Sequence, residues 1–461
     1  MKRIESDGLG SVELPEEALY GIHSYRAMEN FPISHRMIDD ELIDSIVLIK
    51  KAAALVNKEN GDLEKEKADA IVKACDEIME GKHHDSFIVD AMQGGAGTSA
   101  NMNANEVIAN LAITFLKGKP GDYKLVHPID DVNMHQSTND VIPSAARLAC
   151  IDKSDRLINN LNQLVGVLEE KADEYGDVIK VGRTQLQDAV PMKMSQSFLA
   201  YASMIERNII KIRENMKHLY SLNLSATAIG TGINASEAYY DKMIGKLSEL
   251  SQKDLSYFAN LFDGTQNADD FVSLSSSIKT CALTLSKMAS DLRFLSSAPN
   301  AGLNEINLPA MQSGSSIMPG KINPVIPEAL NQAAFLTVGH DMTIALACEA
   351  GQLELNAFLP VIFFQLFEEI EILNNAVSVF TDRCVKGISV NRDVCAVDAG
   401  KCYSLATALN PLIGYDHATA IVKKAKAEKR SLFEIAEREY GLSREQLEEL
   451  LDPLNQSGNP K

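Results

Sequence analysis

Five long stretches of helical hydrophobic spacing constrain this chain more than any other feature of its sequence. They run roughly over residues 141–174, 191–222, 267–297, 324–350 and 361–384, and the breaks between them carry Gly or Pro. A 30-residue helix is about 45 Å long at about 1.5 Å per residue. The spacing therefore predicts a mainly α fold with a long central five-helix bundle.

The last of these stretches is apolar on more than one face, over residues 361–364, 366–367 and 370–379. A helix that is apolar nearly all round must be buried on all sides. One five-helix bundle can hardly bury it alone, so we predict a homo-oligomer built around the bundle. A central helix buried within one subunit is the alternative.

The pattern changes along the chain and predicts three domains. Residues 1–139 are expected to be mostly helical, with an irregular first forty residues followed by helices over about 41–60 and 64–79 and a third after the loop 94–98. Residues 140–395 hold the bundle. Residues 396–461 are expected to form a small helical domain with a loose tail.

Composition excludes several classes of protein. The formal charge of −19 argues against a nucleic-acid partner, and no apolar run is long enough to span a membrane. The charged N-terminus lacks a signal-peptide core, and seven dispersed cysteines are typical of free thiols in a reducing compartment. We therefore expect a cytoplasmic protein. Because the chain is strongly negative, a dianionic substrate would need local cations or aligned hydrogen-bond donors to bind.

Small polar residues gather in five loops beside glycines or at expected helix starts. These loops are 93–99 with Asn101, Asn103 and Asn105; 136–140; 182–188; 227–234; and 314–324. Each one alone is best explained as a helix cap or a turn. Together they exceed what caps require, and helix N-termini favour bound anions. A pocket for a small dicarboxylate is the functional interpretation.

The loop from Gly314 to Pro324 is the most informative of the five. Ser315 and Ser316 are adjacent hydroxyls after a glycine, and Lys321 and Asn323 follow within a short reach. Such a loop can present a hydroxyl and a cation together and close over an anion. The sequence has no nucleophile elbow, Walker loop, dinucleotide fingerprint or metal-ligand spacing. We therefore expect neither a resident metal nor another cofactor, although the sequence does not settle activation by a divalent cation.

These blocks, in this order, resemble the aspartase/fumarase superfamily. The similarity runs from residues 20–23 through the serine loop to residues 410–415. It implies three mostly helical domains, five-helix bundles that assemble into a homotetramer, and active sites shared between subunits. It also implies a reversible anti elimination from a succinyl compound through an aci-carboxylate, which makes preorganised donors important.

The resemblance assigns roles residue by residue. Ser315 is expected to be the base, acting as an alkoxide, while Lys321 binds a carboxylate and Asn323 hydrogen-bonds it. The donors around the carboxylate that gains charge are expected to be Thr98, Ser137, Thr138 and Ser316. Asn139, Thr184 and Gln185 are expected near the leaving group.

Two features favour ammonia over water as the leaving group. Fumarases resembling this chain place a histidine where Gln185 stands, and hydroxide needs a proton donor that departing ammonia does not. Residues 325–327 also depart from the usual fumarase sequence, whereas Glu328 matches it. The resemblance thus implies elimination of ammonia from L-aspartate. A class II fumarase and a catalytically silent structural member are the alternatives. At three positions, Ile129, His135 and Ala100, the chain also departs from the residues commoner in the family.

Overall fold

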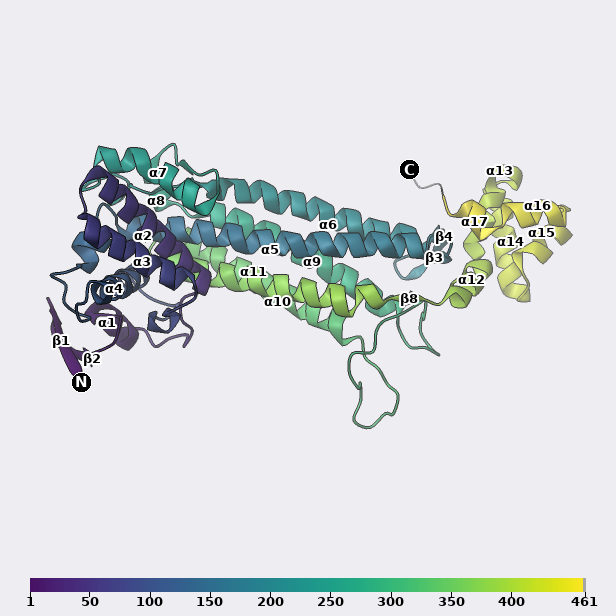
Figure 1. Ribbon diagram of the computed structural model, residues 1–461. Helices are drawn as coiled ribbons and strands as arrows, with labels where there is room; N and C mark the ends of the chain where they lie inside the picture. Colours follow the sequence, from purple (N-terminus) through teal and green to yellow (C-terminus); the bar gives the residue numbers. More distant parts are fainter. Residues whose placement is uncertain (459–461) are drawn as a thin grey trace. The chain divides into compact units, whose positions relative to one another are not determined.

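The computed structural model describes residues 1–458 and is mainly helical, which confirms the predicted fold class (Figure 1). The five long helices are α5 (Thr138–Glu174), α6 (Met194–Met216), α9 (Asp269–Leu295), α10 (Val325–Glu349) and α11 (Leu359–Arg383). Each lies on a predicted stretch. The largest difference is at the end of α6, because residues 217–220 form a 3-10 helix and residues 221–222 form a short strand.

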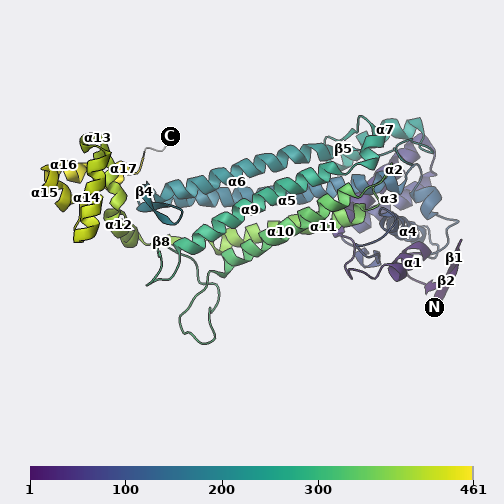
Figure 2. The same cartoon turned by 180° about the vertical axis from the view of Figure 1, so that it is seen from behind.

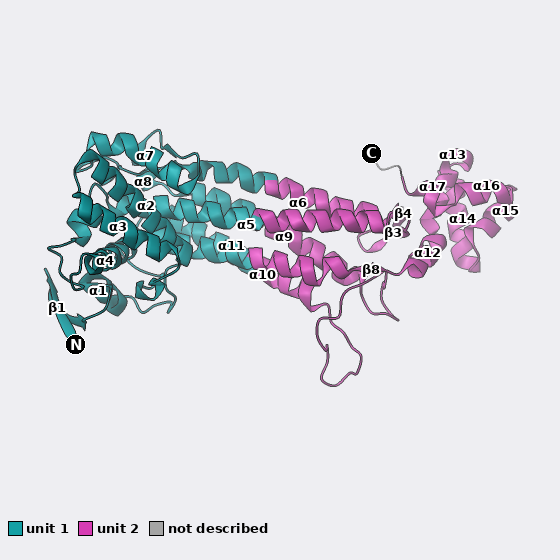
Figure 3. Ribbon diagram, viewed as in Figure 1, with its two compact units in different colours: residues 1–157, 210–280, 335–372 teal, residues 158–209, 281–334, 373–461 magenta. Residues whose placement is uncertain are grey.

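The chain forms two compact units, shown in different colours in Figure 3. Unit 1 contains residues 1–157, 210–280 and 335–372, and unit 2 contains residues 158–209, 281–334 and 373–461. Each of the five long helices contributes residues to both units. The division into three domains stays a prediction, and residues 459–461 of its last domain lie outside the described residues.

The three helices predicted early in the chain belong to unit 1. They are α2 (Asp40–Asn60), α3 (Lys65–Met79) and α4 (Thr98–Phe115). α2 begins where the Asp39 side chain accepts a hydrogen bond from the N–H of Glu41, and it ends at Gly61, whose φ of 81° suits glycine. The start and stop signals therefore act as local chemistry predicts.

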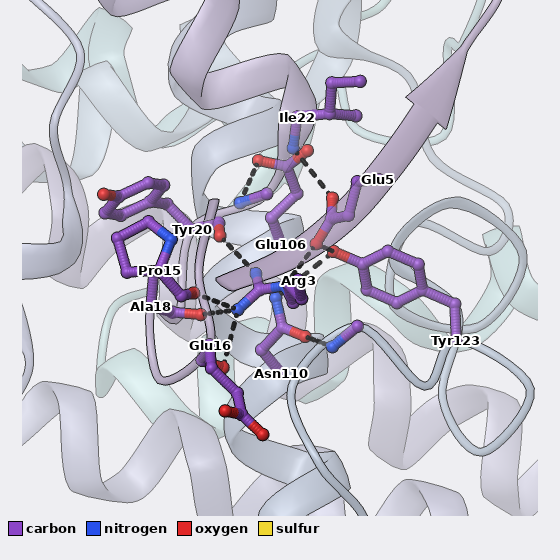
Figure 4. A network of polar contacts seen from close by, with 12 residues as sticks. Arg3, Glu5, Pro15, Glu16, Ala18, Tyr20, Ile22, Glu106, Asn110 and Tyr123 are labelled. Carbon is purple, nitrogen blue, oxygen red and sulfur yellow. Dashed lines mark hydrogen bonds and ion pairs between the residues drawn. The ribbon is translucent and has the colours of Figure 1, made fainter. Parts of the chain in front are cut away.

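The prediction that the first forty residues are irregular is wrong. Strands β1 (Lys2–Asp7) and β2 (Gly10–Pro15) form an antiparallel hairpin, and helix α1 (Ile22–Asn30) follows. Arg3 ties the hairpin to the next segment (Figure 4): its guanidinium donates to the backbone carbonyls of Pro15, Glu16, Ala18 and Tyr20. These bonds join residues far apart in the sequence, so hydrophobic spacing does not reveal them.

Glu106 of α4 anchors the start of α1. Its carboxylate accepts hydrogen bonds from the backbone N–H groups of Gly21, His23 and Ser24, at 2.8 to 3.1 Å. A Cβ at position 21 would lie 2.7 Å from this carboxylate, so the approach requires glycine. Burial raises the pKa of Glu106, and the bonds from Ser24, His23 and Gly21 oppose that rise. The anchor holds α4, whose first residue is Thr98.

A polar cluster lies inside unit 1 between α9, α10 and α11. The Ser275 hydroxyl lies 2.7 Å from Glu369 Oε2 and 3.0 Å from Asp341 Oδ1, and Lys279 pairs with Asp341 at 2.5 Å. Glu369 is fully buried. Burial raises its pKa well above the ordinary value of 4.5, and the nearby Asp341 charge adds to the rise while the Ser275 hydrogen bond opposes it.

The raised pKa of Glu369 makes unit 1 sensitive to pH. The folded chain keeps this proton at pH values where the unfolded chain loses it, so stability falls as pH rises from about 4.5 toward the folded pKa. We expect Glu369→Gln to remove this loss, so that its melting temperature gains on the wild type as pH rises above about 4.5. Thermal unfolding across that range measures the gain. The exposed Glu354→Gln variant is the control, and equal pH curves for wild type and Glu369→Gln would contradict the assignment.

Unit 2 carries its own core in the C-terminal part of the chain, where α12–α17 pack together. Buried residues there include Leu405, Leu409, Ile421, Ile435 and Leu447. The helices are α12 (Arg392–Lys401), α13 (Asn410–Ile413), α14 (Tyr415–Glu428), α15 (Leu432–Tyr440), α16 (Arg444–Leu450) and α17 (Pro453–Gln456). The short, charged helices predicted after residue 395 are therefore present.

The remaining elements are short (Figure 2). They are β3 (Ile179–Thr184), β4 (Gln187–Lys193), β5 (Ser221–Leu222), α7 (Glu237–Ser251), β6 (Ser256–Tyr257), α8 (Leu261–Gln266), β7 (Ile306–Asn307) and β8 (Ser389–Val390). The strands pair two by two, β3 with β4, β5 with β6 and β7 with β8. In residues 1–458 no helix combines the length and the apolar character needed to cross a membrane.

Candidate active site

The starts of α4 and α5 lie together in unit 1. Thr98 is the first residue of α4, after Gly97, and its hydroxyl donates to the Gly95 carbonyl at 2.8 Å. Asn101, one turn into α4, places its side-chain amide 3.4 Å from the hydroxyl oxygen of Thr138, the first residue of α5. Two of the polar blocks singled out in the sequence therefore meet, at helix ends that favour anions.

Ser137 caps α5. Its hydroxyl oxygen accepts from the N–H of Asn139 at 3.3 Å, while the Asp140 carboxylate reaches back to the N–H of Ser137 at 2.8 Å. The bond from Asp140 is that of a capping box, whereas the Ser137 hydroxyl accepts from the second N–H of the helix instead of the third. Since the hydroxyl oxygen of Ser137 accepts from the backbone, its proton can be donated to a bound anion.

A third polar block, residues 227–234, joins the same place. The N–H of Ile229 lies 3.5 Å from the side-chain oxygen of Asn139. Pro143 lacks the N–H that would bond the Asn139 carbonyl in α5, and the side-chain amide of Asn223 donates to that carbonyl at 2.9 Å. Thr227, with a φ of 43°, donates to the Ile233 carbonyl at 2.8 Å. Unit 1 thus gathers three of the five blocks.

A buried ionisable pair beneath these helix starts was not identified from the sequence. Lys50 of α2 and Asp140 are both fully buried. Desolvation lowers the pKa of Lys50 to about 7, against the opposing effect of Asp140, and it raises the pKa of Asp140 to about 6. The sequence does contain one sign of this buried lysine: Lys50 lies on the apolar face of its helix, one turn after Ile46 and Val47.

His135 faces away from the helix starts, toward α2 and α7. Its Nδ1 lies 2.9 Å from the side-chain oxygen of Asn57, and its ring centroid lies 5.1 Å from that of Tyr239. The backbone of His135 has a φ of 61°, which is uncommon outside glycine and asparagine. These contacts explain its departure from the commoner family residue as packing.

In unit 2, Thr184 and Gln185 lie at the exposed turn of the β3–β4 hairpin. The two turn residues, Gln185 and Leu186, have φ values of 53° and 60°. A two-residue turn of this kind normally uses Asn and Gly, because a side chain strains a left-handed backbone. Such strain, about 1–3 kcal/mol per residue, is typical of functional sites.

Glu305 holds this hairpin in unit 2. Its side chain is fully buried, Lys180 Nζ lies 2.9 Å from its Oε2, and Arg183 donates to its Oε1. Both basic residues belong to β3, the strand that leads into the turn. Glu305 was missed in the sequence because nothing local distinguishes it from a surface glutamate.

The serine loop, residues 314–324, closes on itself at its base. The N–H of Gly314 donates to the Lys321 carbonyl at 3.0 Å, and the Asn323 side-chain amide donates to the Gly314 carbonyl at 2.8 Å. A Cβ at position 314 would lie 2.3 Å from the Lys321 carbonyl oxygen, so the closure requires glycine. Ser316 and the Lys321 side chain are exposed.

Ser315 is half-buried in this loop and its hydroxyl oxygen is turned toward the backbone. It accepts from the N–H of Ile317 at 3.2 Å and from the N–H of Met318 at 3.0 Å. Two N–H groups aimed at one oxygen favour a negative charge there. The arrangement can stabilise the alkoxide form of a serine.

The ten predicted site residues are divided between the units. Unit 1 holds Thr98, Ser137, Thr138 and Asn139, and unit 2 holds Thr184, Gln185, Ser315, Ser316, Lys321 and Asn323. The roles assigned to them stay predictions. All seven cysteines are free and six are buried, and no group of three His, Cys, Asp or Glu residues suited to a metal ion occurs within the described part of the chain.

Known proteins resemble this chain over nearly its whole length. Residues 10–339 match the family model described as "Lyase", and residues 405–455 match that of the "Fumarase C C-terminus". An aspartate ammonia-lyase from a Bacillus species is 47% identical over 451 residues, covering 98% of this chain and 96% of the relative. The aspartate ammonia-lyase of Helicobacter pylori strain J99 is 45% identical, with coverages of 98% and 97%.

Solved structures share the fold over the whole chain. A fumarate lyase:delta crystallin from Brucella melitensis, bound to cobalt, has a TM-score of 0.97 and 44% identity, with all of both chains covered. The class II fumarase of Schistosoma mansoni has a TM-score of 0.96 and 34% identity, with 99% of both chains covered. With its serine loop, its ordered polar blocks and these full-length similarities, the chain belongs to the aspartase/fumarase superfamily of lyases.

Proposed function

We propose that this protein is an aspartate ammonia-lyase that eliminates ammonia from L-aspartate to give fumarate, with Ser315 as the base. The observation that carries the proposal is the pair of backbone N–H groups, from Ile317 and Met318, at the Ser315 hydroxyl oxygen. They stabilise the alkoxide that a serine needs to accept a weakly acidic proton.

The proposed reaction has two steps. Ser315 alkoxide takes the Cβ proton, and the electron pair of the broken C–H bond moves into the neighbouring carboxylate as an aci-carboxylate. The C–N bond then breaks, its electrons leave with neutral ammonia, and the C=C bond of fumarate forms. The proposed steps use no resident cofactor, because side chains and backbone groups supply the base and the hydrogen-bond donors. Parallel assays with and without a chelator test whether a divalent cation activates the enzyme.

Several groups are proposed to hold the two carboxylates. The hydroxyls of Thr98, Ser137, Thr138 and Ser316 surround the carboxylate that gains charge, and Lys321 with Asn323 binds the substrate from the serine loop. The capping geometry of Ser137 and the junction of α4 with α5 support this assignment, since both leave hydroxyl protons available beside helix N-termini.

We also propose a homotetramer with shared sites. Phe335, Met342 and Leu346 recur on one face of α10 and are 60 to 65% exposed in the single chain. An apolar helix face of this kind is the surface that a second copy of the bundle covers. The division of the predicted site residues between two units is in keeping with sites completed by neighbouring subunits.

Ammonia rather than water is the proposed leaving group. Gln185 occupies the strained hairpin turn, and an amide is a poor proton donor for departing hydroxide. The curated relatives at 44 to 47% identity are aspartate ammonia-lyases, whereas the Schistosoma mansoni fumarase is 34% identical. We place the protein in the cytoplasm, in keeping with free cysteines that are mostly buried.

Parallel assays of L-aspartate and L-malate test the proposal. Fumarate formation, followed by its ultraviolet absorbance, should give a kcat/KM for aspartate at least about 100-fold above that for malate, since a site built for one polar group rejects the other strongly. Faster turnover of malate would identify a fumarase. Turnover of neither substrate would leave the structural-protein alternative.

A further inference from the structure

Lys50 lies at one end of a chain of hydrogen bonds that leads to Thr138. In its ammonium form a lysine donates and cannot accept. Lys50 Nζ donates to the side-chain oxygen of Asn133 at 2.7 Å. The Gln136 carbonyl, which only accepts, bonds the Asn133 amide nitrogen, and the Lys50 ammonium favours the same orientation of the Asn133 side chain.

Asn133 passes this orientation to α4. Its side-chain oxygen also accepts from the amides of Asn101 and Asn105, each at 3.2 Å, and its own amide donates to the Gln136 carbonyl at 3.1 Å. Asn101 and Asn105 are therefore held with their nitrogens toward Asn133. Asn103, between them, bonds the backbone of Ser86 and Ile88 instead and is structural.

The chain ends at Thr138. The Asn101 amide, whose other hydrogen points to Asn133, lies 3.4 Å from the Thr138 hydroxyl oxygen. A hydroxyl has one proton and two acceptor sites. With one acceptor site facing the Asn101 amide, the Thr138 proton is directed outward, where a carboxylate can accept it.

We propose that Lys50 is a positioning residue for the dicarboxylate: acting through Asn133 and Asn101, it sets Thr138 as a hydrogen-bond donor to the substrate. This rests on the proposed function, which gives Thr138 that role. Lys50 lies outside all five polar blocks and, being fully buried, does not need to touch the substrate.

Lys50 also compensates the buried Asp140 carboxylate, so removing its charge carries a cost in stability that has to be separated from any effect on binding. Methionine keeps the aliphatic part of the lysine side chain and removes only the ammonium group. In a chain of charge −19, a positive charge beside these helix starts also favours the binding of a dianion.

The test uses succinate, a dicarboxylate with no leaving group, in calorimetric titrations of the full-length protein. Lys50→Met should weaken succinate binding about tenfold, the effect of one hydrogen bond, at temperatures where thermal unfolding shows that the variant is still folded. With aspartate, KM should rise about tenfold while kcat stays within about twofold. Lys51→Met is the matched control, because Lys51 is the next residue on α2 and pairs with Asp76 instead.

A double-mutant cycle with Thr138→Val separates positioning from a general structural role. If Lys50 acts through Thr138, Lys50→Met should add little to the loss caused by Thr138→Val. Additive losses would overturn the inference, and so would a Lys50→Met variant that binds succinate like the wild type. If Lys50→Met does not fold, Asn101→Ala interrupts the same chain and should give the same tenfold loss; unchanged affinity there overturns the inference.

These outcomes are distinct from failure of the proposed function. A wild-type protein that binds succinate and converts aspartate, alongside a Lys50→Met variant with unchanged affinity, rejects only the role of Lys50. A wild-type protein that neither binds succinate nor forms fumarate rejects the proposed function, and with it the role of Lys50.

Discussion

Replacement of Ser315 by alanine is expected to lower kcat for aspartate by at least about 100-fold, within the range of 10²–10⁴ that general-base catalysis contributes. The change removes one oxygen from a half-buried position that the backbone N–H groups of Ile317 and Met318 surround. The loop closure does not use that oxygen, because it depends on Gly314, Lys321 and Asn323. The variant should therefore fold normally and lose chemistry alone.

Two measurements make the Ser315 experiment specific. Succinate affinity, measured by calorimetry, should change little in Ser315→Ala, since the carboxylate donors remain. Ser313→Ala, an exposed hydroxyl two residues earlier in the chain, should keep full activity. A Ser315→Ala enzyme with wild-type kcat would reject this residue as the base and revive a silent or differently catalysed member of the superfamily.

Removal of Glu305 is expected to have the largest effect on stability. Glu305→Ala leaves Lys180 and Arg183 without the buried carboxylate that both contact. Breaking a buried ion pair by removing one partner costs about 3–5 kcal/mol, because the remaining charge stays buried and uncompensated. We expect a loss of this size in denaturant unfolding at fixed protein concentration, which matters if the protein is a tetramer.

The same variant should also affect activity, because Glu305 holds the hairpin whose turn contains Thr184 and Gln185. The strained turn, with positive φ at Gln185 and Leu186, needs support from the surrounding structure to persist. We expect a lower kcat/KM for aspartate at temperatures where the variant is still folded. Asp177→Asn, which breaks the exposed pair between Asp177 and Arg392, is the control and should change neither property measurably. Equal unfolding curves for Glu305→Ala and wild type would contradict the anchoring role.

Much of the helical architecture follows from local chemistry. The stretch predicted at 141–174 is α5, and the helix predicted over about 41–60 is α2, which Gly61 ends in the left-handed conformation. Hydrophobic spacing predicts such helices because each turn buries the same face. The N-terminal hairpin was missed because Arg3 stabilises it through carbonyls that lie 12 to 17 residues away.

The candidate site also combines residues that the sequence reveals with residues that only the fold brings together. The serine loop could be recognised because Gly314, the two serines and Lys321 are neighbours in the sequence. Lys50 and Glu305 could not be recognised from the sequence, because the residues that each contacts lie about 80 to 120 positions away. A lysine in a helix and a glutamate in a loop have no distinguishing local pattern.

By itself, the sequence determined the five long helices and the family, and it predicts which residues supply a base and bind carboxylates. These depend on periodicity and on short motifs, which act over a few residues. Only the tertiary structure decided that two N–H groups face the Ser315 oxygen, that Glu305 pairs with β3, and that a buried lysine donates to Asn133. The physical reason is that burial and hydrogen-bond direction belong to groups brought together by folding.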